Sequence, residues 1–262
     1  MLALACVGGC AAAPGTRDSL VQSRLDGCPV VPVRTRAGLS TGWFIGPGEL
    51  VMCSHPLDRG TGRGEIAIAG WGAKYEVIKS GDELKTAWGR SDRLDDSLPK
   101  QEYEHDWAVL RLSPSLSRTD IFATPTFDAI LAKTPAQTGE LLYVVGFTVP
   151  EDDRAGQWAT GEQAAPLLPL RIVREVEVVE LPSRFAAIGS RGLMWVRSRG
   201  GEVLHVGFSG APLWRARADG KLEICGLLSG AERNASNGAP TDLGVALHVP
   251  ARLRSPRDEP TR

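Results

Sequence analysis

The stretch that decides the fold reads Ser40-Thr41-Gly42-Trp43-Phe44-Ile45-Gly46-Pro47-Gly48-Glu49-Leu50-Val51-Met52-Cys53-Ser54-His55. Its two apolar runs are separated by a Gly-Pro-Gly turn, which predicts a β-hairpin. The second strand of this hairpin ends on a histidine. A single histidine at a strand end is usually a polar edge residue, so the rest of the chain decides what His55 does.

Short runs of the same strand type continue on both sides of the hairpin, most of them bounded by Gly, Pro, Asp or Ser. They cover residues 29–34, 42–45, 65–69, 107–112, 141–147, 170–179, 193–196, 211–214, 222–228 and 244–249. Only residues 121–133 and the segment after Pro250 suggest helix. Many short strands without alternating helices predict an all-β protein, either a barrel or a sandwich.

The composition is that of a folded globular protein. The chain has 262 residues, of which 42% are hydrophobic and 23% charged, and this length allows one large domain or two small ones. The 30 Gly and 18 Pro residues indicate many short elements joined by tight turns. The formal net charge of −1 argues against a general binder of nucleic acid or of anionic membranes, which would carry a basic excess.

The N-terminal residues are small and apolar up to a cysteine at position 10. Val7-Gly8-Gly9-Cys10 resembles the end of a bacterial lipoprotein signal, in which the cysteine is acylated. This resemblance predicts export to the cell envelope or the extracellular space, with lipid at Cys10 as the only membrane attachment. The alternative is a disordered, Ala-rich tail. We expect residues 1–27 to be a signal and a linker, and residues 254–262 to be a disordered tail. No later segment reaches the ~20 apolar residues of a membrane span.

The five cysteines give no metal signature. If processing removes Cys6 and acylates Cys10, then Cys28, Cys53 and Cys225 remain, and three cysteines cannot all pair within one chain. No C-x-x-C spacing suggests zinc. We expect these three to be small buried hydrophobic residues, with one disulfide as an open alternative, and we expect no metal or cofactor.

Three polar residues stand where apolar strands begin or end. His55 ends the hairpin, Asp106 opens the strand Trp107-Ala108-Val109-Leu110-Arg111-Leu112, and Ser209 lies on a Gly-rich turn before another strand. Nucleophilic catalysis by a hydroxyl needs an imidazole that takes its proton and a carboxylate that fixes the imidazole tautomer. It also needs backbone N–H groups aimed at the developing oxyanion. Gly207 and Gly210 allow a backbone that points N–H groups into a pocket.

Other histidines fit this chemistry less well. His105 adjoins Asp106, but neighbouring strand residues point to opposite faces, so we expect it in solvent. His205 could line a specificity pocket or be a polar loop residue. The order Ser209, Asp242, His248 imitates that of an α/β-hydrolase, yet Ala211 replaces the second glycine of the nucleophile elbow, and no alternating βα pattern precedes the serine.

These segments resemble the trypsin-like serine peptidases of the chymotrypsin fold, particularly the bacterial exported ones. The resemblance rests on Gly42-Trp43-Phe44-Ile45 with Cys53-Ser54-His55, on Asp106 with Ala108-Val109-Leu110, on Gly207-Phe208-Ser209-Gly210-Ala211-Pro212-Leu213, and on Gly226-Leu227-Leu228-Ser229-Gly230. It covers roughly residues 29–253. It implies two six-stranded β-barrels, over residues 28–125 and 126–253, with the active site in the cleft between them.

The same resemblance assigns roles to residues. It makes Ser209 the nucleophile, His55 the general base and then acid, and Asp106 the orienting carboxylate, and it forms the oxyanion hole from the N–H groups of Gly207 and Ser209. A protein or peptide is then the substrate. The pocket floor lies near Val203, and the substrate-binding walls lie near Ser229, Gly230 and Ala231. None of these is charged, which favours apolar or small substrate side chains.

Three positions depart from the pattern of that family. Phe208 replaces the Asp or Asn before the serine, and because it cannot receive a new N-terminal amine, we expect no activation of the zymogen type. Ala211 adds a methyl group where a glycine is usual. Pro56 fixes φ and lacks an N–H directly after the histidine. These departures motivate an alternative hypothesis, a catalytically inactive chain of the same fold that binds a protein or peptide.

Overall fold

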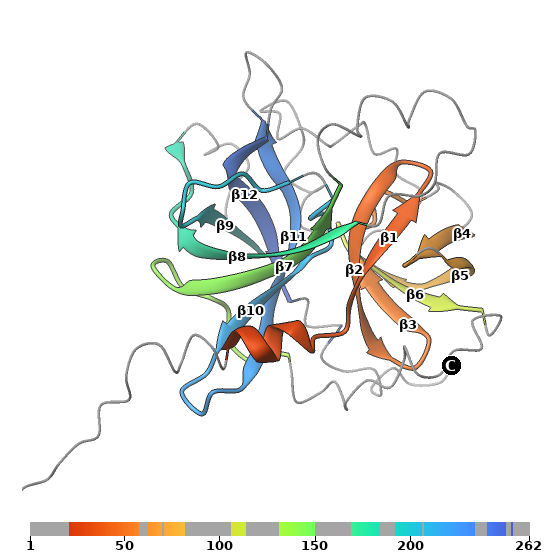
Figure 1. Cartoon of the computed structure of the whole chain (residues 1–262), viewed down its shortest axis with the longest axis horizontal. Helices are drawn as coiled ribbons and strands as arrows, with labels where there is room; N and C mark the ends of the chain where they lie inside the picture. Colours follow the sequence, from red (N-terminus) through yellow and green to blue (C-terminus); the bar gives the residue numbers. More distant parts are fainter. Residues whose placement is uncertain are drawn as a thin grey trace, which may run out of the picture.

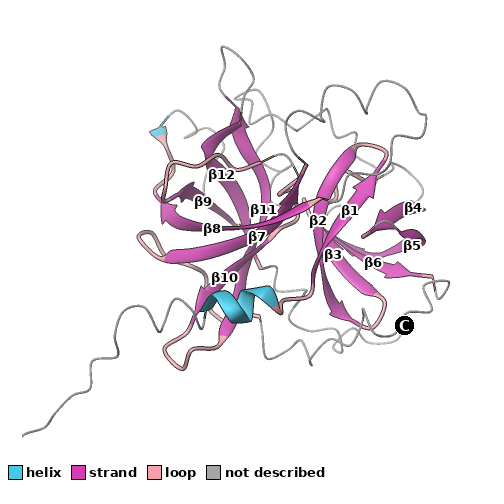
Figure 2. Ribbon diagram, in the orientation of Figure 1, coloured by secondary structure: helices cyan, strands magenta, loops and turns pink. Residues whose placement is uncertain are grey.

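The computed structural model describes residues 21–57, 62–69, 71–81, 106–113, 131–149, 169–183, 192–205, 207–233, 240–249 and 253. Within these residues almost all regular structure is β, arranged in two closed antiparallel barrels (Figures 1 and 2). The first barrel has the strand order β1-β2-β3-β6-β5-β4 and the second the order β10-β11-β12-β9-β8-β7. The predicted all-β class with two six-stranded barrels is confirmed, and the α/β-hydrolase hypothesis is wrong.

The first barrel contains β1 (Val30–Thr35), β2 (Gly38–Gly46), β3 (Glu49–Met52), β4 (Arg63–Ile68), β5 (Trp71–Ser80) and β6 (Ala108–Leu112). The second contains β7 (Leu141–Thr148), β8 (Leu170–Val179), β9 (Leu193–Ser198), β10 (Pro212–Ala216), β11 (Leu222–Arg233) and β12 (Pro240–His248). The predicted boundary between residues 125 and 126 lies outside the described residues, between β6 and β7.

One strand, β5, was not predicted from the sequence. It carries buried Ala73 and Tyr75 between exposed Gly72 and Lys74, which is the alternation of a half-buried strand and the signal that could have found it. The helix predicted for residues 121–133 is also wrong for its last three residues, 131–133, which are not helical. Leu131 forms an isolated parallel bridge with Ile224 of β11, and the rest of that helix lies outside the described residues, as does the tail from residue 254.

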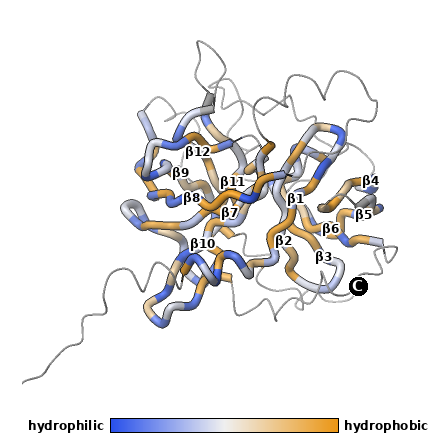
Figure 3. The backbone as a smooth tube through the Cα atoms, in the orientation of Figure 1, coloured by the Kyte–Doolittle hydropathy of each residue, from blue (hydrophilic) through white to orange (hydrophobic). Residues whose placement is uncertain are grey.

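Among the described residues, three hydrophobic clusters form the core. One fills the first barrel around Phe44, Leu50 and Leu110, and one fills the second around Val144 and Leu213. The third combines residues of both barrels, among them Trp43, Val51, Val109, Phe147 and Trp214. Figure 3 shows the hydrophobic residues following the strands, while hydrophilic residues gather at hairpin turns such as the one between β10 and β11.

The third cluster explains why β3 and β6 read as continuous apolar runs. Alternate residues of a strand point to opposite faces. In β3, Leu50 belongs to the cluster inside the first barrel, whereas Val51 belongs to the cluster that both barrels share. In β6, Leu110 and Val109 divide in the same way. Because both faces are buried, the ends of these two strands are fixed at the junction of the barrels.

Residues 21–26 differ from the predicted linker, because they are helical. Their apolar residues Val21 and Leu25 are buried, Leu25 completely. Nη1 of Arg24 donates to the carbonyl of Gly220, and Arg171 of β8 forms an ion pair with Asp26 at 3.3 Å. This short helix precedes the first barrel in the chain but packs on the second (Figure 1).

Cys10 lies outside the described residues, so its lipidation stays a prediction. No helix among the described residues is long and apolar enough to cross a membrane.

Replacing Leu25 by alanine tests whether this helix is part of the fold. The side chain is fully buried, so its truncation should lower the free energy of unfolding by about 2–5 kcal/mol, measured by denaturant titration. Ser23→Ala is the control, because Ser23 is exposed on the same helix and should change the stability by less than about 0.5 kcal/mol. Equal stability of Leu25→Ala and the wild type would contradict the docking.

Candidate active site

The site begins beyond the ends of two neighbouring strands of the first barrel. β3 and β6 are antiparallel, with Met52 paired to Ala108. Continuing this register by two residues places Ser54 opposite Asp106. The backbone N–H of Ser54 donates to Oδ1 of Asp106 at 3.0 Å, and that of His55 donates to the same oxygen at 2.9 Å. Strand register therefore brings His55 and Asp106 together.

The carboxylate of Asp106 is buried and accepts hydrogen bonds at both oxygens. Oδ1 also accepts from Oγ of Ser54 at 3.1 Å, and Oδ2 accepts from Nδ1 of His55 at 2.8 Å. Burial by itself raises the pKa of the carboxyl group, but the charge and hydrogen bonds of His55 and the hydroxyl of Ser229 lower the pKa of Asp106 to about 2. Asp106 is therefore ionised at neutral pH. Its contribution to stability is present above the ordinary carboxyl pKa and is lost as the pH falls through about 2.

The hydrogen bond to Asp106 fixes the tautomer of His55. An ionised carboxylate can only accept, so Nδ1 of the neutral imidazole carries the proton and Nε2 is left as an acceptor. The side chain of His55 is 18% exposed, whereas that of Asp106 is 2% exposed. The imidazole is thus the solvent-facing member of the pair, and this is the geometry of a general base oriented by a carboxylate.

The second barrel supplies a further donor to this carboxylate. The hydroxyl of Ser229, in β11, donates to Oδ2 of Asp106. The sequence predicts Ser229 only as a wall of the substrate pocket, so this contact is an addition. The two residues stand 123 positions apart in the chain and in different barrels. No local pattern could therefore have indicated the bond.

The loop that carries Ser209 lies at the same junction. The carbonyl of Ser209 accepts the backbone N–H of Thr41, in β2 of the first barrel, at 2.8 Å. The N–H of Gly210 donates to the carbonyl of Leu228, next to Ser229, at 2.7 Å. An added Cβ on Gly210 would lie 3.1 Å from the backbone nitrogen of Cys53, two residues before His55. Ser209 itself is partly exposed.

Two backbone donors of this loop are unoccupied. Within the described residues, the N–H groups of Gly207 and Ser209 donate to no protein acceptor. Gly207 is buried and has a φ of +105°, which glycine adopts without steric cost. A buried N–H without an acceptor is rare in folded proteins. These are the two donors that the sequence predicts for an oxyanion hole.

The structure accommodates all three departures from the family pattern. Phe208 is 1% exposed and belongs to the cluster inside the second barrel; its ring occupies the space where a Cβ on Gly146 would lie. Ala211 is fully buried in the same cluster. Pro56 lies inside a turn closed by the N–H of Leu57 and the carbonyl of Ser54 at 3.0 Å, where no N–H is required of it.

The predicted substrate-pocket residues lie in the second half of the chain, and Ala231 packs against the hydrophobic cluster inside the second barrel. Val203, Gly230 and Ala231 are partly buried, and Leu204 is completely buried. The side chain of Leu204 lies so close to Gly244 of β12 that a Cβ there would meet its Cδ1 at 2.7 Å. The ring of His205 packs edge-on against Phe208, with ring centroids 5.8 Å apart. His105, the other candidate histidine near Asp106, lies outside the described residues.

Cys53, His55 and Asp106 bring metal-ligating atoms within 4.8 Å of one another. Burial, with the nearby charge of Asp106, raises the pKa of the Cys53 thiol well above its ordinary value, so the sulfur is a neutral S–H that donates to the carbonyl of Leu228 at 3.4 Å. Both carboxylate oxygens already accept hydrogen bonds. This arrangement suits a hydrogen-bonded pair of His55 and Asp106 better than a metal ion, which needs a thiolate and free lone pairs. Cys28, Cys53 and Cys225 form no disulfide with one another.

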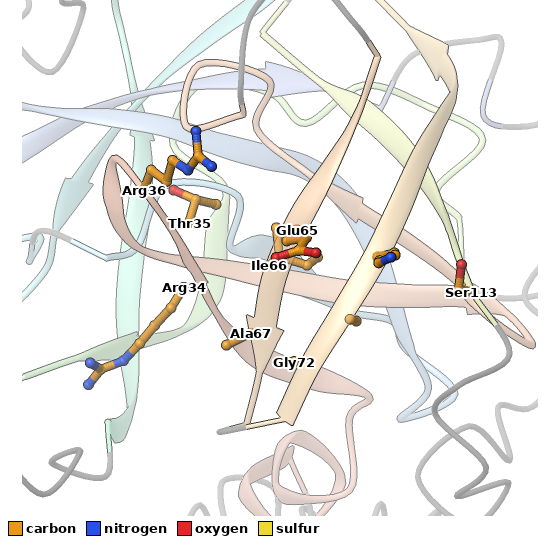
Figure 4. A pocket seen from close by; sticks show the side chains of 10 residues that line it. Arg34, Thr35, Arg36, Glu65, Ile66, Ala67, Gly72 and Ser113 are labelled. Atoms are coloured by element: carbon orange, nitrogen blue, oxygen red, sulfur yellow. The ribbon is translucent and has the colours of Figure 1, made fainter. Parts of the chain in front are cut away.

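A cavity of about 810 Å³ opens elsewhere, on the first barrel. The side chains around it come from the β1–β2 hairpin and from β4 and β5 (Figure 4), and they include Arg34, Arg36 and Glu65. None of its lining residues belongs to the His55 and Asp106 pair or to the Ser209 loop. The cavity is therefore separate from the candidate active site.

The chain resembles solved structures over most of its length. The chain superimposes on neuropsin, a serine protease expressed in the limbic system of mouse brain, with a TM-score of 0.51 and 17% identity over 86% of this chain and 91% of that one. The chain has the chymotrypsin fold. The active form of the Rv3671c protease from M. tuberculosis is a further match, with a TM-score of 0.49 and 16% identity over 95% of this chain and 88% of that one. No sequence model of a protein family matches the chain, and no curated protein does.

Replacing Gly210 by alanine should prevent the Ser209 loop from docking on β2. Gly210 has a φ of +91°, and a Cβ there would lie 2.0 Å from the carbonyl oxygen of Thr41. The matched control is Gly139→Ala, because Gly139 has a φ of +85° but no atom within 4 Å of its Cβ position. Both variants carry the backbone strain, and the clash should cost Gly210→Ala about 1–3 kcal/mol more in denaturant unfolding. Equal losses in the two variants would refute the tight contact.

Proposed function

We propose that this chain is a serine endopeptidase that hydrolyses peptide bonds through Ser209, His55 and Asp106. The observation that carries the proposal is the pair of unoccupied N–H donors at Gly207 and Ser209, beside a histidine whose tautomer a buried carboxylate fixes. The likeness to neuropsin, a serine protease with the same fold, supports the reaction class. The packing of Phe208 and Ala211 in the second barrel, and the place of Pro56 in a turn, support an active chain over an inactive binding protein of the same fold.

In this reaction Oγ of Ser209 attacks the carbonyl carbon of the peptide bond, and Nε2 of His55 takes the hydroxyl proton. The oxyanion accepts hydrogen bonds from the N–H groups of Gly207 and Ser209. As the C–N bond breaks, His55 gives the proton to the leaving amine and an acyl-enzyme remains. Water then attacks the ester carbon with His55 as base, which releases the acid and restores the serine. Asp106 stays ionised throughout and stabilises the imidazolium.

Covalent labelling with a fluorophosphonate tests the proposal. Such a probe phosphonylates a serine only where a base and an oxyanion hole are assembled. We expect residues 21–262 to be labelled at Ser209, identified by peptide mass spectrometry, with labelling lost in Ser209→Ala and slowed at least about 1,000-fold in His55→Ala.

The thermal unfolding curve of each variant is the control, because it shows whether lost labelling reflects a lost side chain or an unfolded protein. His55 and Ser209 are both partly exposed, so these substitutions should leave the chain folded. A well-folded wild type that takes up no probe would overturn the assignment and favour the inactive binding protein.

The residues near the predicted pocket favour small or apolar substrate side chains on the acyl side of the cleaved bond. Val203, Gly230 and Ala231 are uncharged, and the Leu204 side chain fills the space beside Gly244. In a panel of peptides that differ at this position, we expect cleavage after Ala, Val or Leu to exceed cleavage after Lys or Arg by at least about tenfold. Ser209→Ala controls for contaminating proteases. Cleavage mainly after Lys or Arg would contradict this preference.

A further inference from the structure

Thr41 joins the two barrels at the Ser209 loop. It is completely buried in β2 of the first barrel. Its backbone N–H donates to the carbonyl of Ser209 at 2.8 Å, and its hydroxyl donates to the carbonyl of Gly207 at 2.7 Å. The backbone N–H of Phe147, in β7 of the second barrel, donates to the same hydroxyl oxygen at 3.1 Å. One residue thus binds both carbonyls that flank Phe208 and one strand of the opposite barrel.

The direction of the hydroxyl proton follows from these contacts. A hydroxyl group has one proton to donate and lone pairs to accept. Because the N–H of Phe147 uses a lone pair of Oγ1, and because a carbonyl can only accept, the proton must point at Gly207. The contacts with Phe147 and Gly207 therefore fix the orientation of the Thr41 hydroxyl group without a water molecule.

This hydrogen bond holds one end of a peptide plane whose other end is also held. The carbonyl of Gly207 and the N–H of Phe208 belong to the same planar peptide unit. The hydroxyl of Thr41 binds the carbonyl, and the N–H of Phe208 donates to the carbonyl of His205 at 3.1 Å. Rotation of this unit would break both bonds.

The next two peptide units are held from other directions. The carbonyl of Phe208 accepts the N–H of Ala211 at 2.8 Å, which turns the N–H of Ser209, in the same unit, the opposite way. The carbonyl of Ser209 is bound by Thr41, and the N–H of Gly210 by Leu228. Among the described residues of this loop, the N–H groups of Gly207 and Ser209 remain without a protein acceptor.

We propose that Thr41 is a positioning residue for catalysis, whose hydroxyl sets the peptide unit between the two oxyanion donors. This inference rests on the proposed function. Thr41 touches no reacting atom; it acts through Gly207. Phe208 anchors the loop by apolar burial in the second barrel, and Thr41 anchors it by hydrogen bonds from the first. The orientation of the donors consequently depends on how the two barrels are joined.

The test compares Thr41→Val, which keeps the shape and removes the hydroxyl, with Thr41→Ser, which keeps the hydroxyl. For Thr41→Val we expect kcat on a peptide substrate, and the rate of fluorophosphonate labelling, to fall about 10- to 100-fold, because a misplaced oxyanion donor loses most of its effect. KM should stay within about threefold of the wild type, and Thr41→Ser should keep kcat within about threefold. The control is Thr35→Val, which removes a hydroxyl that bonds only inside the β1–β2 turn and should leave kcat unchanged.

Amide hydrogen exchange gives a second readout that needs no activity. Thr41→Val should speed the exchange of the Phe208 and Phe147 amides by at least tenfold, while the amides of β9 keep their wild-type rates. A folded Thr41→Val with wild-type kcat overturns the inference, and so does one with unchanged exchange at Phe208. If the wild type itself takes up no probe, the proposed function fails, and the exchange rates still decide whether the hydroxyl holds the loop.

Discussion

The buried carboxylate of Asp106 is the group on which the rest of the site depends. A charge removed from water is tolerated only where hydrogen bonds replace its hydration. Here the donors are the backbone N–H groups and the Ser54 hydroxyl just beyond β3, the imidazole of His55, and the hydroxyl of Ser229 in the other barrel. The same bonds that stabilise the charge fix the histidine tautomer and tie β11 to the first barrel. The hydrogen bonds to Asp106 therefore both stabilise the fold and orient the imidazole of His55.

The Ser209 loop contains no buried charge at position 208; apolar packing and hydrogen bonds to its backbone hold it in place. Its side chain at position 208 is apolar, so the loop is held in the second barrel by hydrophobic burial and carries no ion pair at this position. Its carbonyls are bound from the first barrel by Thr41. Apolar burial in one barrel and hydrogen bonds from the other therefore hold the loop from both sides.

The His55–Asp106 pair and the Ser209 loop lie at the junction of the barrels because β3 and β6 are buried on both faces. Their outer residues, such as Val51 and Val109, join a cluster that also contains Phe147 and Trp214 of the second barrel. The packing that closes the barrels against each other thereby positions the residues just beyond these strands. The helix formed by residues 21–26 adds a further tie, since it precedes the first barrel and packs on the second.

The sequence determined the strand pattern and the two barrels, and it singled out His55, Asp106 and Ser209 as candidate site residues, because apolar runs, Gly-rich turns and a resemblance in ordered motifs are all local features. Even there, β5 was overlooked, although Ala73 and Tyr75 alternate with polar residues. Only the tertiary structure decided that Ser229 binds Asp106, that Phe208 packs into the second barrel, and that Thr41 holds Gly207. These contacts join residues far apart in the chain, and no propensity or period of a single segment encodes which distant partner a side chain will meet.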